Sequence, residues 1–223
     1  MPLLNPRSYL FVPGTRPDRF PKACAAGADV VILDLEDSVA PAEKVNARAA
    51  IAEWLSAAQP VMLRVNTSDS EWFADDLSLA KRPGIAGVLL PKAERVEEIR
   101  MVVGSFGSGV PILPQIETAR GFRNALTLAG AENVQRLLFG SIDFQLDLGM
   151  VAEEDELLFF RSQIVLDSRL AGIFPPVDGV TTDINSPDRV RVDTLRARRL
   201  GFGGKMCIHP KHCLLYTSDA ADE

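Results

Sequence analysis

Short apolar runs alternate along the chain with longer segments that mix alanine with charged residues. Each run is apolar nearly throughout rather than at every second position, a pattern typical of a strand that is covered on both faces. Eight runs have this character: Tyr9–Val12, Val30–Leu35, Val61–Val65, Ala86–Leu90, Ile112–Ile116, Leu137–Phe139, Gly172–Phe174 and Lys205–Ile208. We predict that these runs are β-strands.

The segments between the strands have the composition and the terminal signals of helices. Ser186 followed by Pro187, for example, supplies an N-cap and a proline for the first turn. The helices predicted in this way are Pro41–Ala58, Ala93–Val103, Glu153–Ala171 and Ser186–Leu200. Connections of this length are too long for hairpins, so the strands are expected to form a parallel sheet.

A parallel sheet can be open and doubly wound, or it can close into a barrel. An open sheet that binds nucleotides predicts a glycine-rich loop after an early strand, but no G-x-G-x-x-G or Walker pattern accompanies Val12-Pro13-Gly14-Thr15. Eight strand–helix repeats favour the (β/α)8 TIM barrel. We therefore predict one catalytic barrel domain over residues 1–210.

Residues 211–223 do not fit the repeat. They are too short and too polar at their end to form an eighth helix, and they resemble a peptide translated from sequencing-adaptor DNA. The expectation is a barrel truncated after strand eight, with a non-native tail that carries no function beyond Pro210.

Charge and composition exclude several classes of protein. The net charge of the 223 residues is −6, so no basic surface for nucleic acid or an anionic membrane is expected. No apolar run is long enough to span a bilayer, and the first residues lack the pattern of a signal peptide. Three cysteines without paired spacing indicate a reducing compartment. These features predict a cytoplasmic protein.

Two carboxylates follow predicted strands that are neighbours in a barrel. Glu117 comes directly after Ile112–Ile116, and Asp143 follows Leu137–Phe139. Both should reach the catalytic end of the barrel, where their mutual repulsion favours a bound cation. Oxygen ligands without cysteine or histidine indicate Mg²⁺ rather than zinc. The alternative is that each carboxylate only caps the helix that follows it.

Arg64 lies in an apolar strand, where a guanidinium must have a partner. Its planar donors suit a substrate carboxylate or a developing enolate oxygen, whereas a buried salt bridge with Glu36 or Asp37 is the structural alternative. Either Glu36 or Asp37 could hold a metal-bound water or act as a general base. The alternative is that these acids only cap the helix that begins after Pro41.

Three cations follow the first strand at intervals of three residues. Arg16, Arg19 and Lys22 would lie on one side of a helical turn, as a local cationic patch for phosphates on an acidic protein. A solvated surface is the alternative for this patch. His209, at the end of the eighth strand, is expected to be a structural histidine rather than a ligand.

Six segments together resemble the citrate lyase β-subunit-like proteins of the HpcH/HpaI aldolase superfamily, which includes malyl-CoA and citramalyl-CoA lyases. The resemblance extends from about Arg7 to Pro210, with the segments in the family's order and spacing. They are Arg7–Gly14, Leu33–Val39, Leu63–Asn66, Leu90–Lys92, Ile116–Thr118 and Gly140–Asp143.

The resemblance implies a Mg²⁺-dependent barrel that cleaves 3-hydroxyacyl thioesters of coenzyme A or of an acyl carrier protein. It assigns Glu117 and Asp143 to the metal, and Arg64 and Glu117 to the substrate. In the chemistry that the family implies, Asp37 could remove the α-proton in the condensing direction. It also implies that coenzyme A is held by Phe11, Arg16, Arg19 and Lys22.

In this family a C-terminal helical segment packs over a neighbouring subunit, so the full-length protein would be a homo-oligomer, a trimer. The present chain is expected to lack that segment. Two alternative functions therefore stay open. One is a non-catalytic barrel that binds metal and a 2-oxo acid, and the other is a class II aldolase that acts on free hydroxy acids.

Overall fold

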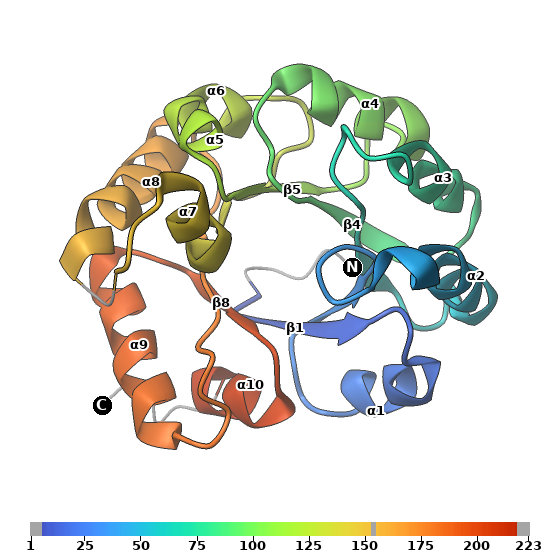
Figure 1. Ribbon diagram of the computed structural model, residues 1–223, viewed down its shortest axis with the longest axis horizontal. Coiled ribbons are helices and arrows are strands. Elements are labelled where there is room, and N and C mark those ends of the chain that lie inside the picture. The colour runs from blue at the N-terminus through green and yellow to red at the C-terminus, as the bar shows by residue number, and fades with distance from the viewer. Residues whose placement is uncertain (1–5, 153–154, 218–223) are drawn as a thin grey trace.

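Eight parallel strands close into a barrel in the computed structural model, which describes residues 6–152 and 155–217. Each strand pairs with the next one along the chain, and β8 returns to pair with β1. Figure 1 shows the helices as a ring around these strands. The strands are β1 (Ser8–Pro13), β2 (Val30–Asp34), β3 (Val61–Arg64), β4 (Ile85–Leu90), β5 (Ile112–Ile116), β6 (Leu138–Phe139), β7 (Val177–Asp178) and β8 (Gly204–Cys207).

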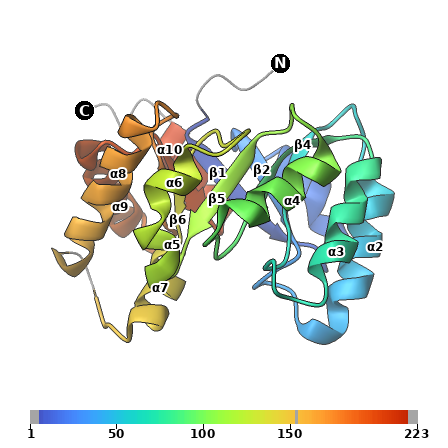
Figure 2. The same ribbon diagram turned by 90° about the horizontal axis from the view of Figure 1, so that it is seen from above.

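Helices cover the outside of the barrel, with α2 to α4 on one side and α6, α8 and α9 on the other (Figure 2). The α-helices are α1 (Phe20–Cys24), α2 (Lys44–Trp54), α3 (Phe73–Leu77), α4 (Val96–Phe106), α5 (Ala119–Arg123), α6 (Ala125–Ala129), α7 (Ser141–Leu148), α8 (Leu158–Leu170), α9 (Pro187–Leu200) and α10 (Pro210–Thr217). Short 3-10 turns are η1 (Pro17–Arg19), η2 (Pro41–Glu43), η3 (Ser78–Lys81) and η4 (Asp155–Leu157). The predicted α/β barrel is therefore confirmed.

The apolar core has two layers because the strands are covered on both faces. One layer fills the inside of the barrel and includes Tyr9, Ile32, Leu113 and Met206. The other lies between the strands and the helices. This double burial explains why the strands are apolar at nearly every position.

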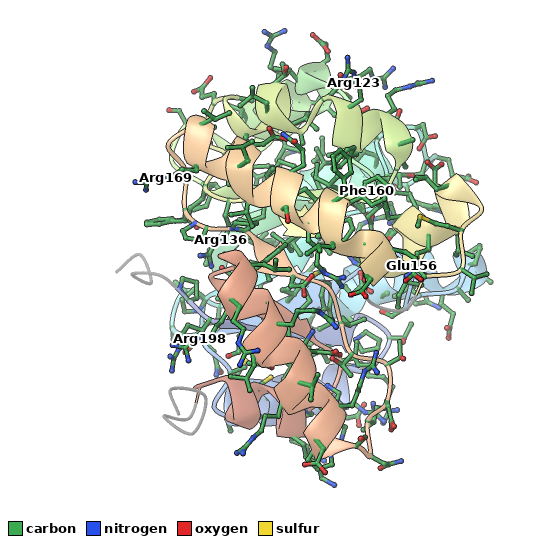
Figure 3. The ribbon with its side chains drawn as sticks, turned by 90° about the vertical axis from the view of Figure 1, so that its left-hand side faces the viewer. Arg123, Arg136, Glu156, Phe160, Arg169 and Arg198 are labelled. Carbon is green, nitrogen blue, oxygen red and sulfur yellow. The ribbon has the colours of Figure 1, made fainter. Side chains whose placement is uncertain are left out.

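A cluster of phenylalanines fixes α7 against its neighbours. The Phe144 ring of α7 lies 5.3 Å from that of Phe139 on β6 and 4.8 Å from that of Phe160 on α8. Phe122 of α5 completes the cluster, 5.1 Å from Phe160. Figure 3 views this side of the molecule, with Phe160 labelled on α8. The packing sets the direction of the first turn of α7, which carries Asp143.

The prediction for the seventh strand is wrong. β7 forms at Val177–Asp178 rather than at Gly172–Phe174. Gly172 has a left-handed φ of 72° in the turn after α8, and Pro175 and Pro176 have no N–H to donate to a sheet. The strand therefore begins only after the two prolines.

A helix follows the eighth strand, where none was predicted. α10 occupies Pro210–Thr217 and packs beside α9 and β1. Pro210 is favourable in a first helical turn, and the side chains of His212 and Cys213 are buried. Of the tail predicted to be non-native, residues 218–223 lie outside the described residues.

The predicted helices are confirmed with shifted ends, and residues 153–154, where one of them was expected to begin, lie outside the described residues. Ser186 caps α9 by accepting a hydrogen bond from the backbone N–H of Arg189. Among the described residues, no helix combines the length and the apolar character that a membrane crossing requires.

Candidate active site

Acidic and basic side chains gather where the strands end, at a face we call the barrel mouth. At the ends of β2 and β3, Asp34 and Arg64 are partners in the sheet register. The Nε and Nη2 atoms of Arg64 donate to the two carboxylate oxygens of Asp34, at 2.6 and 2.7 Å. Both side chains are buried, and this bidentate pair fixes the plane of the guanidinium.

The remaining nitrogen of Arg64 faces two further acids. Nη1 lies 3.1 Å from Glu36 Oε2 and 3.2 Å from Asp37 Oδ2. The alternative role for Arg64, a buried salt bridge with Glu36 or Asp37, is therefore present. Asp34 is a further partner and makes the shortest contacts with the guanidinium. The guanidinium carbon also lies 4.7 Å from the centroid of the Phe11 ring, so the aromatic ring packs on the cation.

Glu117 is buried directly after β5. Its Oε1 accepts a hydrogen bond from Gln115 Nε2 at 2.7 Å, and its Oε2 accepts one from the backbone N–H of Lys92 at 2.9 Å. Burial raises the pKa of Glu117 to about 8, against the opposing effect of Arg64. The cap of α5 is Thr118, so Glu117 is not the cap that the alternative proposed.

Asp143 lies in the first turn of α7 and points to the same mouth. Its Oδ2 is 2.7 Å from the Nζ atom of Lys92, and no side-chain cap bond forms at the start of α7. The ammonium of Lys92 also lies 2.9 Å from Glu36 Oε1. A cation thus already lies among these acids.

Asp37, Glu117 and Asp143 form a group that could hold a metal ion. One carboxylate oxygen from each lies within 4.8 Å of the other two. An all-oxygen set with space for further ligands suits Mg²⁺, which retains waters or takes substrate oxygens. Counted with Asp34 and Glu36, five carboxyl groups lie here. The cations near them are Arg64, Lys92 and Lys44, whose ammonium donates to the carbonyl oxygens of Leu35 and Glu36. Acids outnumber cations among these described residues, and the excess fits a divalent ion.

Two cavities open at the mouth. The central cavity, of about 490 Å³, is lined by Arg64 and the three possible metal ligands. The outer cavity, of about 690 Å³, is lined by Arg16, Arg19 and Lys22. Phe11, Ser38 and Ile208 line both.

The structure brings every predicted site residue to one of these two cavities. The cationic patch extends from Arg16, the residue before η1, through η1 to Lys22 in α1, and Arg16 is paired with Asp18 at 2.9 Å. His209 lines the outer cavity, and its Nδ1 accepts a hydrogen bond from the backbone N–H of Lys211.

Three residues of the site make contacts that were not predicted from the sequence. Asp34 holds Arg64, Gln115 holds Glu117, and Lys92 contacts three acids. Each lies at or just beyond the carboxyl end of a strand. That position is the feature of the sequence that could have identified them as site residues. Asp34 and Gln115 each stand inside an otherwise apolar run, which indicates a buried polar contact.

The sequence of the chain is similar to that of a known protein family and of several relatives. Residues 7–210 match the HpcH/HpaI aldolase/citrate lyase family. A citrate lyase subunit beta-like protein of Deinococcus radiodurans is 37% identical over 222 residues, which cover 94% of this chain and 78% of the relative. A (3S)-malyl-CoA thioesterase of Cereibacter sphaeroides is 31% identical, with 92% of this chain and 73% of the relative covered.

Solved structures agree with these relationships. The structure of CitE from Mycobacterium tuberculosis in complex with magnesium, acetoacetate and coenzyme A has a TM-score of 0.85 and 32% identity, over 96% of this chain and 80% of that one. The citrate lyase beta subunit of the same organism, complexed with oxaloacetate and magnesium, also has a TM-score of 0.85, with 30% identity over 96% of this chain and 98% of that one. The chain belongs to the HpcH/HpaI aldolase/citrate lyase family.

Proposed function

We propose that the protein is a Mg²⁺-dependent carbon–carbon lyase that cleaves a 3-hydroxyacyl thioester into a 2-oxo acid and an acetyl thioester. The observation that carries the proposal is the oxygen group of Asp37, Glu117 and Asp143, beside Arg64, in a cavity that shares lining residues with a cationic one. CitE from M. tuberculosis, which has the same fold, was solved with magnesium, acetoacetate and coenzyme A.

Glu117 and Asp143 are the proposed metal ligands. Both line the central cavity: Glu117 directly follows β5, and Asp143 lies in α7, after the neighbouring strand β6. Both are oxygen donors of the kind that Mg²⁺ prefers. A bound Mg²⁺ would supply a Lewis acid for the hydroxyl and carboxylate oxygens of the substrate.

Arg64 is the proposed cation for the negative charge that develops on the thioester oxygen when the carbon–carbon bond breaks. Its guanidinium lines the central cavity and is oriented before substrate arrives, because Asp34 binds two of its nitrogens. Donors that are fixed in this way stabilise a transition state without reorganisation. Asp37, which is half exposed at the cavity, is the proposed base in the condensing direction.

The outer cavity is the proposed site of coenzyme A. Arg16, Arg19 and Lys22 lie on its wall as cations for phosphate groups, and Phe11 links this wall to Arg64. Replacing Arg16 and Lys22 by alanine should weaken the binding of a coenzyme A thioester, whereas Arg100→Ala, on the exposed face of α4, should not. If the variant that lacks Arg16 and Lys22 binds the thioester as tightly as the wild type and Arg100→Ala do, this assignment is contradicted.

Calorimetry with Mg²⁺ tests the proposed metal site directly. We expect Glu117→Ala and Asp143→Ala to lose most of the affinity, because each removes one ligand. Glu97→Ala removes an exposed carboxylate from α4 and should leave the affinity unchanged. Unchanged affinity in both site variants would contradict the proposal.

A further inference from the structure

Lys92 contacts both proposed metal ligands. It follows β4 with a left-handed backbone, φ 45°, which is uncommon for a side-chain-bearing residue. In this conformation its backbone N–H donates to Glu117 Oε2 at 2.9 Å, while its Nζ lies 2.7 Å from Asp143 Oδ2. One residue therefore binds the carboxylates that follow β5 and β6.

The same ammonium reaches the acids that follow β2. Nζ lies 2.9 Å from Glu36 Oε1 and 3.6 Å from Asp37 Oδ1. The ammonium of Lys92 therefore lies at hydrogen-bond distance from acids that follow two different strands, β2 and β6.

We propose that Lys92 is an internal counter-cation of the metal site, which competes with Mg²⁺ for Asp143. In the metal-free protein its ammonium compensates the repulsion among the acids, and Mg²⁺ takes over that compensation when it binds. The inference rests on the proposed Mg²⁺ site and adds a residue that sets its affinity. It follows from Coulomb attraction, because a competing charge at hydrogen-bond distance weakens the hold of the same carboxylate on a second cation.

Glycine is the informative substitution at this position. Lys92→Gly removes the ammonium but retains the backbone N–H that binds Glu117, and glycine adopts a positive φ without strain. Lys92→Arg keeps the charge. Lys81→Met is the matched control, because it removes an exposed lysine that precedes β4, whereas Lys92 follows it.

The experiment is Mg²⁺ calorimetry on the wild type and these variants. We expect Lys92→Gly to bind Mg²⁺ at least about tenfold more tightly than the wild type, Lys92→Arg to stay within about threefold of it, and Lys81→Met to match it. Affinity that is unchanged or weaker in Lys92→Gly overturns the inference.

The result separates this inference from the proposed function. If the wild type binds Mg²⁺ through Glu117 and Asp143 but Lys92→Gly gains no Mg²⁺ affinity, only the counter-cation inference is contradicted. A wild type that binds no Mg²⁺ defeats both. If the glycine variant does not fold, ¹⁵N NMR of the Lys92 ammonium in the wild type decides: a resonance that shifts on Mg²⁺ saturation supports the competition, and an unmoved one overturns it.

Discussion

Arg64 and Asp34 illustrate how a proposed substrate-binding side chain depends on a buried structural pair. Asp34 is fully buried, and Arg64 supplies two of its hydrogen bonds. Hydrogen bonds from Ser38 and from the backbone N–H of Glu36 complete its environment. The side chain proposed to bind substrate is thus also part of the stability of the mouth.

Arg64→Met should therefore destabilise the protein as well as inactivate it. Asp34 would be left buried without its cation, and breaking a buried ion pair from one side costs about 3–5 kcal/mol. Urea unfolding measures the loss. Arg100→Met breaks an exposed pair with Glu97 and should cost no more than about 1 kcal/mol. A similar small loss for both variants would contradict the structural role of the Asp34 pair.

The raised pKa of Glu117 predicts a pH dependence for the proposed metal site. Burial raises its pKa to about 8 in the metal-free protein, so at lower pH a proton occupies the carboxyl group that Mg²⁺ requires. Mg²⁺ affinity should rise with pH up to about 8, by as much as about tenfold per pH unit, and level off above it.

Calorimetry at a series of pH values checks this dependence. Mg²⁺ binding at pH 7 should also release a proton, seen as a heat that varies with the ionisation enthalpy of the buffer. Affinity that is flat between pH 6 and 8 would contradict a protonated Glu117.

At the residue scale, the sequence predicted the residues at the mouth but not their pairing. Arg64, Glu117 and Asp143 stood out because each is charged at the end of an apolar run. Asp34 was overlooked because three acids occur within four residues, and only the register of β2 and β3 selects the one that meets Arg64. Pairing between strands depends on tertiary structure and leaves no local pattern.

At the scale of elements, the connection from β6 to α7 is shaped around Glu117. Gly140 caps the N-terminus of α7, and a Cβ atom on it would overlap the carboxyl group and Cγ of Glu117. Because Gly140 has no side chain, the start of α7 leaves space for the carboxyl group of Glu117, which follows β5.

Gly140→Ala should abolish or strongly weaken Mg²⁺ binding while the barrel still folds, because Glu117 must leave its position. Gly104, inside α4, is a matched control: a Cβ there meets nothing within 4 Å. Gly104→Ala should retain Mg²⁺ affinity and stabilise the protein by about 0.5–1 kcal/mol. Calorimetry and urea unfolding measure both effects. Full metal affinity in Gly140→Ala would show that Glu117 is free to bind from another conformation.

Most elements could be predicted from the sequence because double burial makes the strands continuously apolar. β7 could not, since it has only two residues and lies beyond two prolines. α10 could not either, because its short segment lacks a helical repeat and its buried side chains depend on α9 and β1. Both failures concern elements whose formation depends on neighbours rather than on local pattern.

At the scale of the whole molecule, barrel closure converts a linear series of strand ends into one site. β1 and β8 meet, so Phe11 of β1 and Ile208 after β8 lie together on the wall that the two cavities share. This arrangement supports the proposed entry of a thioester from the outer, cationic cavity toward the acids of the central one.

Analysis of products from coenzyme A thioesters tests the central proposal most directly. The protein is incubated with malyl-, citramalyl- and citryl-CoA and Mg²⁺, and the products are identified by mass spectrometry. We predict that at least one substrate yields equal amounts of a 2-oxo acid and acetyl-CoA, and that Glu117→Ala yields neither. Release of free coenzyme A with an intact hydroxy acid, which is hydrolysis of the thioester without cleavage of the carbon–carbon bond, would contradict the proposed lyase, as would the absence of product from all three.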